Sequence, residues 1–168
     1  MDESEYLKDN IDNIRNLLTV QPLRESEAKS LKQLIRLSTI MEYEPDTPII
    51  EEGNTDSSIY FLLSGKIRVV REGVEIGSIE KPGEIFGEMR IIDGLERSAS
   101  VFAREKTICL AVNTSMAQNH LSQDERAALL LLLYRIVTEY SAIRLRLANE
   151  EIVEAKKEIE MLKQGGVS

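Results

Sequence analysis

The sequence predicts an α+β domain: an antiparallel β-roll, or jelly-roll-like barrel, with N-terminal helices and a long C-terminal dimerisation helix. Three observations support this fold class. A middle section of short β-rich runs is punctuated by glycines, and amphipathic helical patterns precede it. A helical pattern of roughly 40 residues follows it, far longer than an average globular helix. The predicted divisions are 1–40 for the N-terminal helices, 41–121 for the roll and 122–164 for the long helix.

The N-terminal part contains two helical patterns. Residues 3–20 place apolar side chains at helical spacing until Pro22 interrupts them. A second helix is expected over roughly residues 25–38, and its apolar face contains Ala28, Leu31, Leu34 and Ile35. Since such a face packs on a core, we expect both helices to be structural.

The middle part contains short β-rich runs that begin after residue 43. Glycine and Asx residues separate them, and tight turns use glycine because it readily adopts a positive φ. Evenly spaced short strands with such turns are typical of an antiparallel barrel or jelly roll. The runs are "TPIIEE", "SIYFLLS", "KIRVVRE", "VEIGSIE", "RSASVFA" and "TICLAV".

The long helix begins at "SQDE", a capping box in which Ser122 caps the helix and Glu125 reaches back. Two heptad-spaced apolar stripes follow. The first contains Leu129, Leu133, Ile136, Tyr140, Ile143 and Leu147. The second contains Leu145, Ala148, Ile152, Ala155, Ile159 and Leu162. We therefore expect the helix face to be re-aimed near residues 145–148, with the early turns on the roll and the rest on a second copy of the chain.

Composition excludes several classes of function. The 29 acidic and 21 basic residues give a net charge of −8, which argues against a duplex-binding protein. Cys109 lies in an apolar strand and His120 is far from any metal motif, so neither a disulfide nor a metal site is expected. We find no signal peptide, and the longest apolar run, residues 127–134, is too short for a bilayer. The expectation is a cytoplasmic protein, not an enzyme, with no nucleic-acid or membrane partner.

The segment "GEIFGEMRIIDGLERSAS", residues 83–100, carries the chemistry. Gly87 precedes a run long enough for one or two helical turns, and a helix N-terminus attracts anions. The Arg97 guanidinium can hold two phosphate oxygens, and the small residues 98–100 leave backbone N–H groups reachable. Glu88 would repel a phosphate and suits a hydroxyl donor such as a ribose 2′-OH. The pattern predicts a site for one phosphate and one sugar.

The extended segment "PGEIFGEMRIIDGLERSASVFA" resembles the phosphate-binding cassette of cyclic nucleotide-binding domains. That family includes the bacterial catabolite activator protein and the regulatory subunits of protein kinase A. The upstream "YEPDTPIIEEGNTDSSIYFLLSGKIRVV" resembles the first strands of the family, so the resemblance spans roughly residues 25–150.

The resemblance implies a role for each matching position. Glu88 would take the ribose 2′-OH, Arg97 would pair with the cyclic phosphate, and Asn149 would meet the base from the long helix. The ligand-binding residues it implies are Phe86, Gly87, Glu88, Met89, Arg97, Ser98, Ala99, Ile67, Val69, Ser78 and Asn149. The last four would line the base. Arg90 replaces a usual Ala or Gly, either to help the phosphate or to point to solvent. Ala148 replaces a hydroxyl that contacts adenine, so both cAMP and cGMP stay open.

The predicted function is a stand-alone cyclic nucleotide sensor. It would form a homodimer through its C-terminal helix and pass its state to an unidentified protein partner, because the chain ends at "KQGGVS" without a helix-turn-helix segment. The alternative is an interaction or scaffold protein that binds no ligand. In that case Glu88 and Arg97 would form a partly buried ion pair, and the coiled coil would serve for docking.

Overall fold

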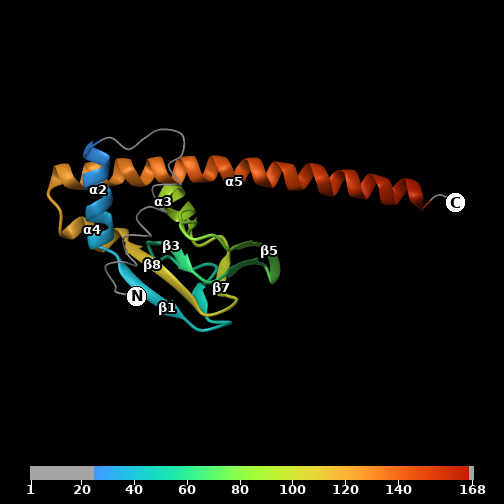
Figure 1. The fold of residues 1–168 in the computed structure, drawn as a ribbon, viewed down its shortest axis with the longest axis horizontal. Helices are drawn as coiled ribbons and strands as arrows, with labels where there is room; N and C mark the ends of the chain where they lie inside the picture. The colour runs from blue at the N-terminus through green and yellow to red at the C-terminus, as the bar shows by residue number, and fades with distance from the viewer. Residues whose placement is uncertain (1–24, 167–168) are drawn as a thin grey trace.

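Two four-stranded antiparallel sheets face each other and form a β-roll, and a long helix lies across one of them (Figure 1). The structure is a computed structural model that describes residues 25–166. One sheet has the strand order β1-β8-β3-β6 and the other β2-β7-β4-β5. The predicted fold class is confirmed, as an open roll rather than a closed barrel. The elements are α2 (Glu25–Arg36), β1 (Thr39–Tyr43), β2 (Pro48–Ile50), β3 (Ser58–Ser64), β4 (Ile67–Arg71), β5 (Val74–Ile79), β6 (Ile85–Phe86), α3 (Met89–Asp93), β7 (Ser100–Ala103), β8 (Thr107–Asn113), α4 (Thr114–Asn119) and α5 (Gln123–Gly165).

Each predicted β-rich run contains a strand, but two strands were not predicted. β1 pairs with β8 from Thr39 opposite Ala111 to Tyr43 opposite Thr107, although its "TIMEY" includes Glu, which is depleted in strands. β6 has only two residues. The helix expected over residues 3–20 lies outside the described residues, and α2 ends at Arg36 rather than near residue 38.

The core consists of two apolar layers that share β3. Successive side chains of a strand point to opposite faces. Tyr60 and Leu62 therefore point between the two sheets, into a cluster with Ile67 and Phe86. On the other face, β3 contributes Ile59, Phe61 and Leu63 to a cluster with α2 and α5. Because both faces are covered, five consecutive residues of β3 are buried.

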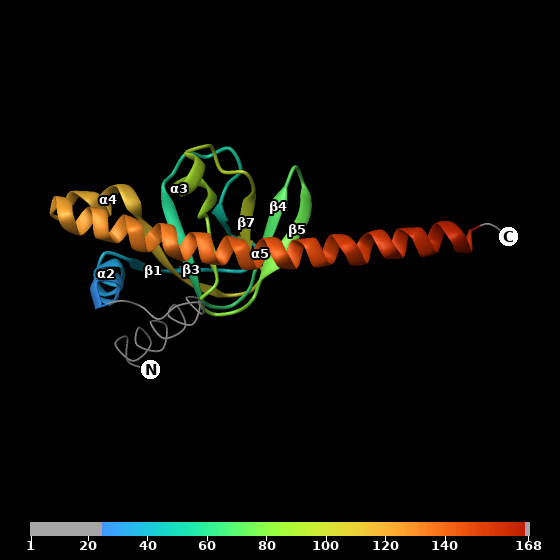
Figure 2. The same ribbon diagram turned by 90° about the horizontal axis from the view of Figure 1, so that it is seen from above.

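The helix α5 continues far past the roll, as Figures 1 and 2 show. It spans 43 residues, close to the predicted length, and the Ser122 hydroxyl accepts the Glu125 backbone N–H at 3.2 Å. This half of the predicted capping box is confirmed. Every residue of 145–166 is exposed. The early turns pack on the β3 sheet through Leu129, Leu132, Leu133, Ile136, Val137 and Tyr140.

The two apolar stripes of α5 lie on different faces of one helix. The first stripe is buried on the roll from Leu129 to Tyr140. When the second stripe is extended toward the N-terminus in the same heptad phase, it reaches Leu131 and Tyr134, which are 72% and 46% exposed. The in-phase positions between Tyr134 and Leu145 are the polar residues Thr138 and Ser141, so the change of apolar face near residues 145–148 stays a prediction.

Candidate functional site

The predicted site is a connection between β6 and β7 that contains one short helix. β6 leads through Gly87 into α3, which ends at Gly94 with φ of 67°. The expected helical turn is confirmed, but Arg97 does not begin a strand. Its backbone N–H donates to the Asn54 carbonyl at 2.8 Å and its carbonyl accepts the Gly53 N–H at 2.9 Å. These bonds tie Arg97 to the loop after β2, and β7 starts only at Ser100.

The Arg97 side chain is buried, with 4% of the residue exposed, and makes four hydrogen bonds. Its Nε and Nη2 donate to the two carboxylate oxygens of Asp56 at 3.1 and 2.6 Å. Nη2 also donates to the Ser58 carbonyl at 2.6 Å, and Nη1 donates to the Gly87 carbonyl at 2.7 Å. A guanidinium has five N–H donors, so one hydrogen on Nη1 is left for a ligand.

Asp56 is a partner of Arg97 that the sequence did not predict. Its hydrogen bonds with Arg97 are the main reason that its pKa lies below the ordinary value. The ion pair between Arg97 and Glu88 that the ligand-free alternative implied is wrong, because Asp56 pairs with the guanidinium instead. No local pattern could have revealed this, since the two residues are 41 positions apart and Asp56 lies in an irregular loop.

Gly87 shapes the site through its backbone. Its φ is 77°, a left-handed conformation that favours glycine. A Cβ at this position would lie 2.8 Å from Arg97 Nη1. The glycine therefore allows its own carbonyl and the guanidinium to approach each other closely.

The cassette lies against α5 through charged and phenolic groups. Burial raises the pKa of Glu88, while the guanidinium groups of Arg144 and then Arg97 act in the opposite direction. Burial is also the main cause that raises the pKa of Tyr140, and the carboxylates of Glu84 and Glu88 add to it. The Arg144 guanidinium lies 5.7 Å from the centre of the Tyr140 ring. Tyr140 and Arg144 were not predicted for the site, although their spacing of four residues places them on one helix face.

The predicted residues next to Gly87 and Arg97 differ in their exposure. Phe86 is buried and stacks on Tyr60, with ring centres 5.0 Å apart. Met89 is 53% exposed, and the Ser98 hydroxyl contacts its sulfur at 3.6 Å. Ala99 is half-buried. Ser98 is exposed, so the backbone edge at residues 98 and 99 lies at the protein surface.

Two of the predicted base-lining residues share a face and one does not. Ile67 and Val69 both belong to the apolar layer between the sheets. Ser78 pairs with Arg68 and is exposed, so its side chain points to the opposite face of the sheet. The residue opposite Val69 is Gly77. The expectation that Ser78 lines the base pocket with Ile67 and Val69 is therefore wrong.

Asn149 and Arg90 also differ from the expectation. Asn149 lies on the exposed part of α5, five residues or about 7.5 Å beyond Arg144, so the helix residues nearest to Glu88 are earlier ones. Arg90 does not point simply to solvent, and its charge is one of the smaller causes that lower the pKa of Asp56, the partner of Arg97. Its Nη1 donates to the carbonyls of Gly94 at 3.2 Å and Leu95 at 2.6 Å, which closes the loop after α3.

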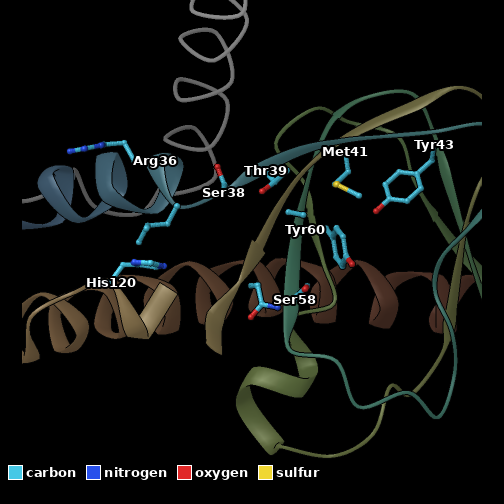
Figure 3. Close-up of a pocket in the computed structure, with 11 residues that line it drawn as sticks. Arg36, Ser38, Thr39, Met41, Tyr43, Ser58, Tyr60 and His120 are labelled. Atoms are coloured by element: carbon cyan, nitrogen blue, oxygen red, sulfur yellow. The ribbon is translucent and has the colours of Figure 1, made fainter. Parts of the chain in front are cut away.

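A separate hollow of about 480 Å³ lies on the inner face of β1, β8 and β3 (Figure 3). Tyr43 and Tyr60 point into it, and Arg36 and His120 lie at the end near α2. None of the predicted ligand-binding residues lines it, but two of its lining residues contact the cassette: the Ser58 carbonyl accepts from Arg97, and Tyr60 stacks on Phe86. Among the described residues, no group of three or more His, Cys, Asp or Glu side chains could hold a metal ion.

Comparison with known proteins agrees with this geometry. The sequence profile of the cyclic nucleotide-binding domain matches residues 40–124, which is half of the chain and includes the whole cassette. The chain belongs to the cyclic nucleotide-binding domain family.

Individual relatives share only part of their length with this domain. The cyclic AMP receptor protein of Thermus thermophilus is 40% identical over 76 residues, 42% of this chain and 34% of that protein. The cGMP-dependent protein kinase of Toxoplasma gondii is 31% identical over 103 residues, 61% of this chain and 10% of that protein. The chain thus spans between a tenth and a third of the length of these relatives.

Solved structures show the same fold. A cyclic nucleotide-binding domain from Methylobacillus flagellatus KT matches with a TM-score of 0.70 and 19% identity, over 86% of this chain and 83% of that one. The catabolite activator protein of Thermus thermophilus matches with a TM-score of 0.55 and 26% identity, over 88% and 63% of the two chains. In the described part of the chain, no helix combines the length and apolar character needed to cross a membrane.

Proposed function

We propose that this domain is a sensor that binds cAMP or cGMP in the cassette and reports binding through a dimeric α5 to a protein partner. The observation that carries the proposal is the buried Arg97 guanidinium, held by the Gly87 carbonyl and flanked by the open edge at Ser98 and Ala99. A buried cation with reachable backbone N–H groups beside it suits a singly charged phosphate diester.

The phosphate would share Arg97 with Asp56. One Nη1 hydrogen is free, and the backbone N–H groups of Ser98 and Ala99 would supply further donors. Because Asp56 already compensates the buried charge, the bound phosphate gains less from Arg97 than it would from an unpaired guanidinium.

The sugar and base would occupy the rest of the cassette. Glu88 is a suitable acceptor for the ribose 2′-OH; burial raises its pKa, and the neighbouring Arg144 acts in the opposite direction. Ile67 and Val69 provide an apolar wall that suits a purine ring. This wall favours neither adenine nor guanine, so the proposal covers both nucleotides.

The signal would reach α5 through the contacts that already join it to the cassette. Ile91 of α3 packs on the same apolar cluster as Leu133 and Ile136 of α5. Tyr140 and Arg144 carry the polar part of that contact. A ligand that binds one arrangement of α3 and α5 better than another shifts the population toward it.

One observation favours the alternative, a scaffold that binds no nucleotide. The Asp56–Arg97 pair satisfies the buried guanidinium without any ligand. In a scaffold the pair would only stabilise the fold, and α5 would serve only for docking to a partner.

A thermal-shift measurement with cAMP, cGMP and 5′-AMP distinguishes the two functions. The sensor predicts that at least one cyclic nucleotide raises Tm and that 5′-AMP, with its doubly charged phosphate, has a weaker effect. Arg97→Lys retains the charge but loses the fork, so it should reduce the shift. Arg104→Lys is the control, because Arg104 is exposed and pairs with Glu75 outside the cassette. If no cyclic nucleotide raises Tm in the wild-type chain, the scaffold function is correct.

A further inference from the structure

The hollow on the inner face of β1, β8 and β3 exists because the central strand β8 carries small side chains on that face. The large residues of its "TICLAVN" pack toward the helices, whereas Cys109 and Ala111 face the other sheet. Ala111 lies opposite Thr39 of β1 on one side and opposite Tyr60 of β3 on the other. A single methyl group at the centre of this row does not fill the space between its neighbours, so Ala111 forms the floor of the hollow.

The facing sheet does not cover this inner face as far as β1. Met41, Cys109 and Leu62 form one row across the three strands. Met41 is 39% exposed, whereas Cys109 and Leu62 are fully buried. The apolar layer between the sheets therefore ends before β1, and the hollow of about 480 Å³ lies at this uncovered margin. Its volume is in the range of small-molecule sites.

Two side chains of the hollow suit a flat aromatic ring. Tyr60 is 8% exposed and stacks on Phe86 with ring centres 5.0 Å apart, so its ring is held in place. Met41 lines the same hollow from the edge strand (Figure 3). A thioether is flexible and makes favourable contacts with aromatic rings. An aromatic ring over Ala111 would therefore have one rigid wall and one adaptable wall.

The two ends of the hollow differ in charge. Tyr43 and Tyr60 lie at one end, and Arg36 and His120 lie at the end near α2 (Figure 3). Burial is the main cause that raises the pKa of both tyrosines, and the Asp56 carboxylate adds to it. A negative charge on a ligand is thus disfavoured beside the tyrosines and favoured at the other end. None of the described residues that line the hollow is Asp or Glu.

Arg36 is available to bind an anion at its end of the hollow. It is exposed in the last turn of α2 and forms no ion pair with an acidic side chain in the part of the chain that the structure describes. Its side chain lies beside α2 in Figure 3, and an exposed side chain can turn toward the hollow. The guanidinium fork matches the two oxygens of a carboxylate.

We propose that the hollow is a ligand site, separate from the cassette, that binds an aromatic carboxylate. The ring lies over Ala111 between Met41 and Tyr60. The carboxylate binds Arg36, and the His120 imidazole lies at the same end. The site does not depend on the proposed sensor function, because none of these residues belongs to the predicted nucleotide site.

Methyl NMR of the full chain, labelled with ¹³C-methyl methionine, tests the proposal with 2-naphthoate as the ligand. Met41 reports the hollow, Met89 reports the cassette and Met161 reports the distal part of α5. Titration should shift the Met41 methyl resonance saturably and leave the Met161 resonance unchanged. An unchanged Met41 resonance, or equal and unsaturable shifts of both, would overturn the proposal.

Ala111→Leu tests whether the ligand lies in the hollow, because the branched side chain fills its floor. The Met41 shift should be lost in this variant. Ala155→Leu is the matched control, since Ala155 is exposed on the distal part of α5, and it should bind as the wild type does. Equal binding by Ala111→Leu and wild type would place the ligand elsewhere and overturn the proposal.

Arg36→Gln tests the charge without disturbing the core, because Arg36 is exposed. The wild type should bind 2-naphthoate about two- to fivefold more tightly than the neutral 2-naphthamide, as expected for an exposed ion pair. Arg36→Gln should lose this preference. Lys32→Gln, one turn earlier on α2 and outside the hollow, should retain it. The same preference in Arg36→Gln and wild type would contradict the proposed orientation.

The same spectra separate the hollow from the sensor site. A Met41 shift in a chain whose Tm does not respond to cyclic nucleotide supports the hollow and removes the sensor. If 2-naphthoate shifts Met89 but not Met41, and cAMP displaces it, the carboxylate binds in the cassette and the proposal is wrong while the sensor stands.

Discussion

The Asp56–Arg97 pair provides the sharpest prediction about what holds the cassette together. Asp56→Asn keeps the size of the side chain and one oxygen acceptor, but it turns the other oxygen into an NH₂ group that faces a guanidinium donor. Arg97 is 4% exposed, so its charge would lose its compensating carboxylate in a site that water reaches poorly. We expect the substitution to lower the free energy of unfolding.

The geometry sets the magnitude. Each of the two bonds between Arg97 and Asp56 would be worth roughly 1.5–3 kcal/mol if both partners were buried. The Asp56 side chain is 44% exposed, so solvent screening reduces this value and one bond partly survives in the variant. The expected loss is about 1.5–3 kcal/mol near pH 7, which corresponds to a fall in Tm of about 3–10 °C.

The loss should depend on pH in a defined direction. Arg97 holds the pKa of Asp56 below its ordinary value, so the wild-type pair contributes its full stability above the unfolded pKa of about 3.9. That contribution disappears as the pH falls through the lower folded pKa. The difference between wild type and Asp56→Asn should therefore stay constant from about pH 8 to pH 5 and close only below about pH 4.

Urea denaturation across this pH range measures the difference. Asp46→Asn is the control, because Asp46 is 84% exposed and lies 3.9 Å from Arg68. Its φ of 62° also suits asparagine, so its stability should change by less than about 0.5 kcal/mol. Equal stability of Asp56→Asn and wild type at pH 7 would refute the structural role of the pair.

Three further predictions concern the backbone, the sugar and the helix. Gly87→Ala should destabilise the fold by about 1–3 kcal/mol, more than Gly73→Ala, because both glycines have φ of 77° but only the Cβ at Gly87 would meet Arg97; equal urea midpoints would contradict the close contact. A 2′-deoxy cyclic nucleotide should bind wild type less tightly than its parent, by titration, but should bind Glu88→Gln with little further loss; an equal penalty in both proteins would place the 2′-OH elsewhere. Saturating nucleotide should change hydrogen exchange in residues 145–162, and identical exchange with and without it would uncouple the ligand from the helix.

Local patterns predicted the elements that depend on local chemistry. The apolar run of β3, the cap at Ser122 and the single turn before Gly94 agree with the structure because turn residues, caps and periodicity act within a few positions. The position of Arg97 and the glycine at 87 were identified from composition and spacing within one connection.

Features that depend on tertiary pairing were not predictable in the same way. The Asp56–Arg97 pair joins two loops that are distant in sequence. Ser78 was expected to line the base with Val69, but Gly77 lies opposite Val69, and a displacement of one residue moves a side chain to the other face of a sheet. The two stripes of α5 overlap in sequence, so only burial distinguishes the face on the roll from the exposed face.

Calorimetric titration of the full chain with cAMP and with cGMP tests the central claim most directly. A cyclic nucleotide sensor should bind at least one of them saturably, with one nucleotide per chain, and Arg97→Lys should bind clearly more weakly because its ammonium cannot reproduce the fork. If a folded chain gives no binding heat with either nucleotide, and neither nucleotide competes with the other, sensor function is contradicted. Equal affinity of wild type and Arg97→Lys would contradict the assignment of the phosphate site.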